Sequence, residues 1–243
     1  MEGLLKDYVR DRNIEIQGLK VALETVQPAE LLRLLITIEH DSYSAIMVAV
    51  EGGHANICRL LLSAIRKTAD ELLWMKKDGW TVLHIAVRRG YSECVELLIN
   101  TVSEDRKYEF VAEKTKYGNT AIALAAGCGS SKCIESLLYT FSSIQRDSLL
   151  NIQNNGLYTP LHYAACNGNT TALKVMLESM SLVTVSSLLN IKNKFNRTPL
   201  EEAQYWTKKE SSKLLKRWQL GSVVEGRIVI QCDTSYSLEL FYC

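Results

Sequence analysis

The spacing of one short pattern constrains the fold of this chain more than any other feature of its sequence. A threonine followed by apolar residues stands at Thr81 and returns at Thr120, Thr159 and Thr198, each 39 residues after the last. A related copy begins at Ser44, 37 residues before Thr81. Self-similarity with a fixed period of about 20 to 50 residues is typical of proteins built from stacked repeats. We therefore expect five repeats that pack on their neighbours in sequence.

The fullest copy of the pattern indicates how one repeat folds. Thr159 can accept a backbone N–H bond at the start of a helix, and Pro160 then occupies the first helical position, where its missing N–H costs nothing. Gly168 supplies the backbone freedom that ends this short helix. Residues 172–177 then carry larger apolar side chains at helical spacing. We expect two helices per repeat, which can bury their apolar surface only in a stack.

This pattern resembles the ankyrin repeat, whose signature is Thr-Pro-Leu-His-x-Ala in a unit of about 33 residues. The resemblance covers roughly residues 40–217 through five copies in register. It implies an all-α solenoid of stacked helix-turn-helix units with projecting turns. The five repeats are expected near residues 40–76, 77–115, 116–154, 155–193 and 194–220.

Each unit is longer than the family's by about six residues. The surplus falls between the second helix and the next threonine, and it contains a recurring apolar pair. A flexible loop without regular structure would not need such a pair. We expect either a lengthened second helix or an added helical turn that returns the pair to the core. The pairs are Leu72-Leu73, Phe110-Val111, Leu149-Leu150 and Leu188-Leu189.

The flanking segments predict how the array ends. Residues 1–39 are expected to form a helical N-terminal cap, because a terminal repeat exposes one face to water and solenoids need atypical ends. In the last repeat, Glu201 and Glu202 are interpreted as part of a solvated capping face. Residues 221–243 favour strands around a turn, and a single hairpin is marginal in water. This tail either docks on the last repeat, pairs with another molecule or is disordered.

Composition and charge exclude several classes of protein. The net charge is +1, from 28 basic and 27 acidic residues, so we expect neither nucleic acid nor an anionic membrane as a partner. No apolar run approaches the roughly 18 residues of a membrane span. The seven cysteines show no metal-ligand spacing, and Cys58, Cys94 and Cys133 share one position in the second helix, where a small buried residue is expected. Reduced thiols predict a cytoplasmic protein, which we expect to be monomeric.

No motif in the chain predicts catalysis, a metal or a cofactor. His84 and His162 hold the fourth position of their tetrapeptides, where the resemblance implies a hydrogen bond between adjoining turns. Glu201-Glu202 is more simply a solvated face than an acid/base couple. The glycine-rich turns lack the Lys-Ser/Thr pair of a phosphate-binding loop. We therefore expect a protein that is not an enzyme.

The resemblance implies a concave face, lined by the turns and first helices, that binds a protein partner. Several variable positions on that face hold aromatic residues or arginine, which are enriched at binding hot spots. An aromatic residue in a turn can instead simply cover its neighbour, an alternative we favour for Trp206. Gly156 lies one residue early in its turn. The candidate binding residues are Lys77, Asp78, Trp80, Arg88, Arg89, Tyr117, Asn119, Tyr158, Tyr163 and Arg197, and Glu202, Tyr205 and Trp206 occupy further variable positions.

One modification is also implied by the resemblance. Ankyrin proteins are often hydroxylated on an asparagine eight positions before the threonine, which Asn151 and Asn190 match. The leading hypothesis is a non-catalytic interaction module that binds a protein partner through the concave face. The alternative is an adaptor whose tail, residues 221–243, docks a second protein.

Overall fold

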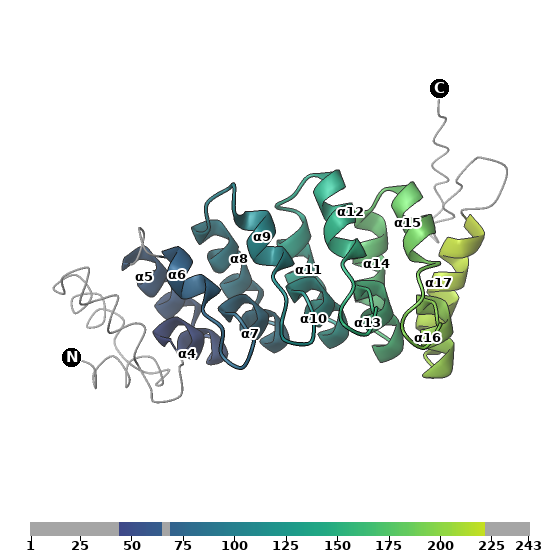
Figure 1. Ribbon diagram of the computed structural model, residues 1–243, viewed down its shortest axis with the longest axis horizontal. Coiled ribbons are helices and arrows are strands. Elements are labelled where there is room, and N and C mark those ends of the chain that lie inside the picture. The colour runs from purple at the N-terminus through teal and green to yellow at the C-terminus, as the bar shows by residue number, and fades with distance from the viewer. Residues whose placement is uncertain (1–43, 65–68, 222–243) are drawn as a thin grey trace, which may run out of the picture. The chain divides into compact units, whose positions relative to one another are not determined.

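The computed structural model describes residues 44–64 and 69–221. Every element of regular structure in these ranges is a helix (Figure 1). The helical cap predicted for residues 1–39 and nearly all of the tail predicted at 221–243 lie outside the described residues. The all-α expectation is confirmed. None of the helices in the described ranges is long and apolar enough to cross a membrane.

The helices follow one another in groups of three, and the last group has two. We number the groups as repeats 1 to 5. Repeat 1 holds α4 (Ala45–Glu51), α5 (Ala55–Ala64) and α6 (Ala69–Trp74); repeat 2 holds α7 (Val82–Arg89), α8 (Ser92–Thr101) and α9 (Lys107–Ala112); repeat 3 holds α10 (Ala121–Cys128), α11 (Ser131–Leu138) and α12 (Ser143–Asn151); repeat 4 holds α13 (Pro160–Asn167), α14 (Thr170–Ser179) and α15 (Leu182–Leu188); and repeat 5 holds α16 (Pro199–Tyr205) and α17 (Lys209–Gly221).

The first helix of a repeat begins and ends at the residues that the pattern predicts. Thr81 and Thr159 cap α7 and α13, and each forms a capping box with the histidine three residues later. Both helices end at a glycine in the left-handed region, Gly90 with φ 78° and Gly168 with φ 80°. A side chain would strain the backbone there, so glycine is the residue that allows the chain to turn into the second helix.

The inserted segment of each repeat forms a separate third helix. These helices are α6, α9, α12 and α15, and all eight residues of the four apolar pairs are buried. The prediction of an added, ordered helical turn is therefore confirmed, and the alternative of a lengthened second helix is wrong. The breaks have local causes: Ser142 and Ser181 cap α12 and α15, which restarts the helix after the second one ends.

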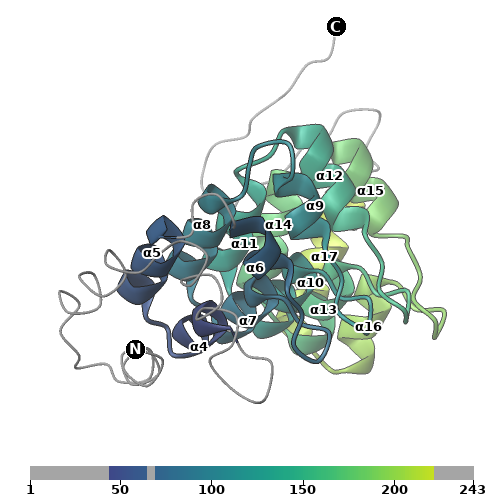
Figure 2. The same cartoon turned by 60° about the vertical axis from the view of Figure 1, so that its left-hand side comes forward.

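The described chain divides into two compact units between Ala121 and Ile122. In the first unit, α4 packs against α5 and α7, while α5 packs against α8. In the second, α13 packs against α14 and α16, and α14 packs against α11 and α17 (Figure 2). First helices thus pack on first helices and second on second. Within each unit, the repeats pack against one another, as expected for a repeat protein.

Small residues fill the positions where helices approach closely. Ala164 and Ala165 of α13 are fully buried, as are the thiols of Cys58 and Cys133 and nearly all of Cys94. The prediction that these cysteines are buried is confirmed. The hydrogen bond with Cys94, together with burial, raises the pKa of the Cys58 thiol. This side chain is therefore a small apolar group of the core rather than a thiolate.

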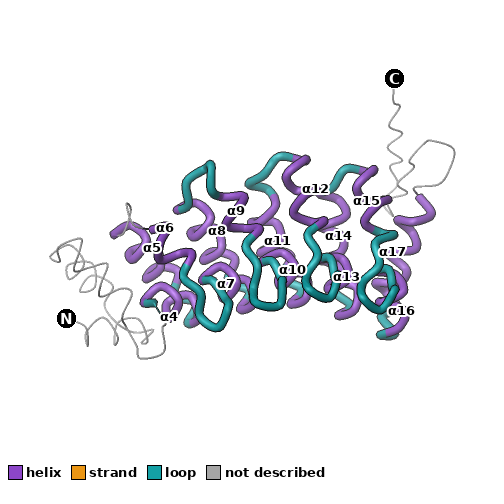
Figure 3. Tube along the Cα trace, in the orientation of Figure 1, coloured by secondary structure: helices purple, strands orange, loops and turns teal. Residues whose placement is uncertain are grey.

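A loop leads into each of the first helices α7, α10, α13 and α16 (Figure 3). Before α7, the backbone N–H of Lys77 donates to the Trp80 carbonyl at 2.9 Å and the N–H of Trp80 donates back at 2.8 Å. The two residues between them, Asp78 and Gly79, have φ values of 52° and 84°. Positive φ at both central positions is the conformation of a type I′ turn. Asp78 is exposed at its tip, and Lys77 is half-buried.

The turn of repeat 4 keeps the geometry of its neighbour although Gly156 lies one residue early. The N–H of Asn154 donates to the Tyr158 carbonyl at 3.1 Å, and the corresponding bond of repeat 5 measures 2.9 Å. The left-handed position therefore falls on Leu157, with φ 60°, where repeat 5 has Asn196 with φ 59°. Asparagine tolerates this region, whereas leucine is strained in it.

Candidate functional site

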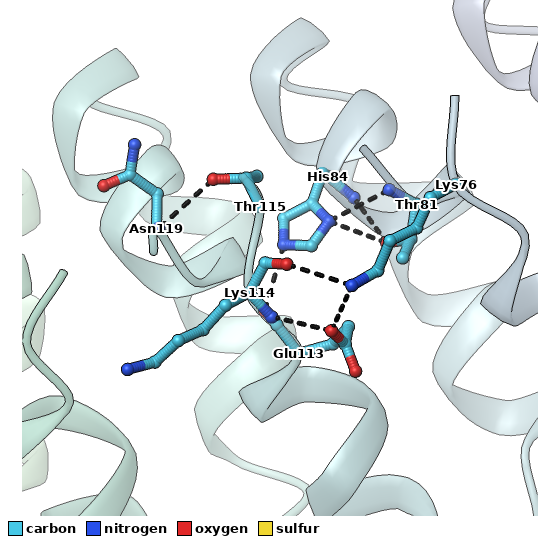
Figure 4. Close-up of polar contacts among 7 residues, drawn as sticks. All are labelled: Lys76, Thr81, His84, Glu113, Lys114, Thr115 and Asn119. Atoms are coloured by element: carbon cyan, nitrogen blue, oxygen red, sulfur yellow. Dashed lines mark hydrogen bonds and ion pairs between the residues drawn. The ribbon is translucent and has the colours of Figure 1, made fainter. Parts of the chain in front are cut away.

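The two histidines of the tetrapeptides join adjoining turns. The backbone N–H of Thr81 donates to Nδ1 of His84 at 3.1 Å, and Nε2 of His84 lies 3.1 Å from the Glu113 carbonyl oxygen (Figure 4). Because a backbone N–H can only donate, Nδ1 is the acceptor and Nε2 carries the proton. His162 repeats this arrangement, with Nε2 3.0 Å from the Arg197 carbonyl oxygen. The predicted hydrogen bond between turns is confirmed for both.

Burial keeps these imidazoles neutral. It lowers the pKa of His84 from 6.5 to about 4 and lowers the pKa of His162 in the same direction. Beside His84, the Lys76 ammonium donates to a Glu113 carboxylate oxygen at 2.6 Å and lies 3.3 Å from the Lys114 carbonyl oxygen (Figure 4). These contacts tie the end of repeat 1 to the end of repeat 2. They stabilise the arrangement of the turns in the first unit.

The candidate residues on α7 and the turn before it contact one another in the first unit. The Arg88 guanidinium lies 5.3 Å from the centre of the Trp80 ring, and that ring meets His84 edge to face at 6.1 Å. Arg89 forms an ion pair with Glu51 at 2.6 Å. Trp80 therefore covers its own histidine and also offers a partly exposed ring. Both arginines are exposed at the surface.

Two further candidate residues lie in the turn before α10. Tyr117 is exposed at the tip, with the Lys116 ammonium 5.2 Å from its ring centre. Asn119 is only 8 % exposed, and its backbone N–H donates to the Thr115 hydroxyl at 3.2 Å (Figure 4). The expectation that Asn119 lies at the binding surface is therefore wrong. Counting back from the threonine cannot reveal this burial, which depends on tertiary contacts.

In the second unit, two candidate tyrosines form a pair. The ring centres of Tyr158 and Tyr163 lie 5.6 Å apart. Asn154 donates a side-chain N–H to the Tyr163 hydroxyl oxygen at 2.9 Å, and the Tyr158 hydroxyl donates to a Glu202 carboxylate oxygen at 3.1 Å. Burial and the charge of Glu202 raise the pKa of Tyr158 to about 12. Both rings are therefore held in place by hydrogen bonds at their hydroxyl groups.

Glu202 is the centre of this site, and its predicted position on a solvated face is wrong. It is 0 % exposed. Besides Tyr158, its carboxylate accepts from the Asn193 side chain at 2.6 Å and from the Trp206 indole N–H at 3.0 Å, while Arg197 lies 3.7 Å away. Its neighbour Glu201 is exposed, because successive residues of a helix point about 100° apart. A buried carboxylate needs such partners.

The third candidate of the second unit, Arg197, stacks on aromatic rings. Its guanidinium carbon lies 3.5 Å from the centre of the Tyr205 ring and 5.6 Å from that of Phe195. Trp206 meets Tyr205 edge to face at 5.2 Å. Phe195, Tyr205 and Trp206 are 53 to 58 % exposed. We name Phe195, Arg197, Tyr205 and Trp206 the aromatic cluster.

The structure thus enlarges the predicted site. It brings Tyr158, Tyr163 and Arg197 together near Glu202. It also adds Phe195, which was not among the predicted residues although it precedes its threonine by three residues, as Tyr117 does. The favoured interpretation of Trp206 as a packing residue holds for its indole N–H, which donates to Glu202, while much of its ring stays exposed. The register of the turn relative to Thr198 was the available signal for Phe195.

The predicted hydroxylation positions lie on or beside third helices. Asn151 ends α12 and Asn190 follows α15, and both side chains are exposed. Each donates its amide N–H to the carbonyl four residues earlier, at 3.1 Å to Asp147 and 2.8 Å to Ser186. In the part of the chain that the structure describes, no group of three or more His, Cys, Asp or Glu side chains could hold a metal ion.

Comparison with known proteins agrees with this architecture. A family model described as ankyrin repeats in three copies matches residues 19–108 and 70–148, which together span more than half of the chain. A second model, of the single ankyrin repeat, matches residues 157–193. A search of curated proteins found no match. The matched ranges contain the capped helices α7 and α13, and on these grounds the chain belongs to the ankyrin-repeat family.

Proposed function

We propose that this chain is a non-catalytic module that binds a protein partner through its turns and first helices, the concave face of ankyrin proteins. Ankyrin repeats are general protein–protein interaction modules. The observation that carries the proposal is the site around Glu202, where Tyr158, Tyr163 and Arg197 meet. Tyrosine and arginine are enriched at binding hot spots.

The rigidity of this site favours binding. Hydrogen bonds to Asn154 and Glu202 hold the two tyrosine hydroxyls, and two rings hold the Arg197 guanidinium. Immobilising a mobile side chain at an interface costs about 0.5 to 1.5 kcal/mol of conformational entropy. Side chains that are already ordered avoid much of this cost when a partner binds. The site is therefore suited to recognise a partner without rearrangement.

The titratable side chains support a role without catalysis. Both ring nitrogens of His84 and of His162 are engaged, and burial lowers the pKa of each imidazole. Burial and the charge of Glu202 raise the pKa of Cys166 to about 11, so its thiol stays protonated and is a weak nucleophile. We expect this protein to be a monomer in the cytoplasm; the cysteines of the described residues form no disulfide, in keeping with that location.

The experiment begins with capture of a partner by the full-length protein from its native cell, identified by mass spectrometry. Calorimetry with the purified partner then compares Trp80→Ala, Tyr163→Ala and the double variant with the wild type. We expect the double variant to weaken binding by more than about 2 kcal/mol, which is about 30-fold in Kd. Val183→Ala is the control, because Val183 is exposed on the third helix α15. An unchanged Kd in the double variant would reject the proposed surface.

A further inference from the structure

We infer that the aromatic cluster of repeat 5 docks an acidic protein segment, which places a carboxylate on Arg197 and an apolar side chain on Tyr205 and Trp206. The inference rests on the proposed function and specifies the chemistry of the partner at the same face. Three observations carry it: the unused donors of Arg197, the charge of the repeat around it and the exposure of the rings beside it.

Arg197 is held in place while its donors remain available. Its backbone is fixed on both sides, since its N–H donates to the Asn193 side chain at 3.2 Å and its carbonyl oxygen lies 3.0 Å from Nε2 of His162. Among the described residues its guanidinium donates no hydrogen bond, and the nearest carboxylate oxygen, of Glu202, is 3.7 Å away. The Glu202 oxygens already accept three other hydrogen bonds.

A carboxylate is the group that fits such an arginine. The guanidinium presents planar N–H donors in a fork that matches a carboxylate with two parallel hydrogen bonds. The Arg197 side chain is 29 % exposed, so a ligand can reach it from solvent. The rings of Tyr205 and Phe195 lie against the planar face of the guanidinium, so the N–H donors along its edge remain available to the ligand. An incoming Asp or Glu therefore has no internal hydrogen bond to displace.

Positive charge is concentrated in the same repeat and in the residues just before it. Residues 190–221 carry a net charge of +5, although the whole chain carries +1. One of the three acidic residues in this range, Glu202, is buried. A local excess of positive charge attracts an acidic segment and speeds its association. The basic residues are Lys192, Lys194, Arg197, Lys208, Lys209, Lys213, Lys216 and Arg217, and the acidic residues are Glu201, Glu202 and Glu210.

The exposed rings require an apolar contact from the partner. Tyr205 and Trp206 are adjacent and contact each other, and both are more than half exposed. Large aromatic residues that gather on a surface with a polar rim mark interaction sites. The Trp206 ring is fixed by its bond to Glu202, so it offers a rigid surface. An aromatic or aliphatic side chain next to the partner's carboxylate would bury these rings.

The ring contacts favour a protein segment over a single-stranded nucleic acid. Bases bind such surfaces by stacking on open aromatic faces. Here Arg197 lies against the Tyr205 face, and Lys194 lies 5.1 Å from the centre of the Phe195 ring. A base would have to displace these cations, whereas a carboxylate binds them where they are.

The test uses a random peptide library displayed on phage, selected on the full-length protein, with Kd values of the enriched peptides measured by fluorescence polarisation. We expect these peptides to share an Asp or Glu beside an apolar residue. Arg197→Lys keeps a cation near Glu202 but removes the fork, and we expect it to weaken binding at least about tenfold. Phe195→Ala, which removes an exposed ring, should weaken binding several-fold with unchanged circular dichroism. Tyr139→Ala also removes an exposed ring of the second unit, at the end of the second helix α11; it is the matched control and should leave binding unchanged.

Several results would overturn the inference. These are the absence of enriched peptides, enriched peptides without a carboxylate, or equal affinity of both variants and the wild type. If binding depends on Trp80 or Tyr163 but not on Arg197 or Phe195, the inference fails and the proposed function stands. If binding depends on none of these residues, both fail. A labelled single-stranded RNA that binds the wild type, and loses binding in both variants, would assign the cluster to nucleic acid instead.

Discussion

Replacing His84 by alanine should remove a specific part of the pH dependence of folding. The folded protein holds this imidazole neutral, because burial lowers its pKa from 6.5 to about 4. Protonation would also place a second N–H against the backbone N–H of Thr81, which now donates to Nδ1 at 3.1 Å. The unfolded chain, in contrast, can protonate the imidazole freely.

The sign and size of the effect follow from this difference. Between pH 6.5 and 4 the unfolded chain binds a proton that the folded chain does not, so the free energy of unfolding falls as the pH falls. His84 therefore lowers the free energy of unfolding by about 2 kcal/mol between pH 7 and pH 5, and by about 3 kcal/mol once the pH reaches 4. His162 acts in the same direction.

Alanine at this position has its own cost, which does not depend on pH. At pH 7 the variant loses the bonds to Thr81 and Glu113 and leaves a small cavity, and we expect a loss of about 2 to 4 kcal/mol. The fold tolerates alanine here, because repeat 3 has Ala123 at the equivalent position. The gap in free energy of unfolding between the wild type and the variant should therefore be smaller at pH 5 than at pH 7, and it should shrink by about 2 kcal/mol.

The assay is urea unfolding of the full-length protein at pH 7 and pH 5, followed by circular dichroism. Leu83→Ala is the matched control, because Leu83 is buried beside His84 and carries no titratable group. This control should be destabilised equally at both pH values. The reasoning is refuted if His84→Ala loses as much stability as the wild type between pH 7 and pH 5. An NMR titration that finds the imidazole at its ordinary pKa would refute it as well.

Three further predictions concern single residues. Glu202→Gln should destabilise the protein by about 2 kcal/mol, because the amide would point an N–H at one of the donors that now hydrogen-bond to the carboxylate. It should also lower the pKa of Tyr158, because the negative charge beside it is lost. Urea unfolding and ultraviolet titration measure the two effects, and unchanged values would contradict the buried network. Leu157→Gly should raise stability by up to about 1 kcal/mol in urea unfolding, because glycine adopts a positive φ without strain; a loss of stability would show that the leucine side chain matters more than its backbone. Asn151 and Asn190 should each gain one oxygen atom in protein from its native cell, and an unmodified intact mass would reject this.

Much of the fold could be predicted from the sequence because its signals are local. A capping threonine, a proline in the first turn and a left-handed glycine act within a few residues, so a recurring interval marks where helices start and end. The hydrogen bonds of His84 and His162 followed from the same register. The apolar pairs predicted ordered inserts, but only the structure distinguished a third helix from a longer second one.

The candidate site was predictable only in part. Counting from the threonine identified Tyr158, Tyr163 and Arg197, but it also selected the buried Asn119. Phe195 was not selected, although it occupies the position of Tyr117 in its repeat. Two adjacent glutamates suggested one solvated face, yet Glu202 accepts hydrogen bonds from residues 4, 9 and 44 positions away. The sequence by itself determined the repeat and its register, since those depend on neighbours along the chain. Tertiary structure decided which charges are buried and which rings are exposed, because those depend on contacts between repeats.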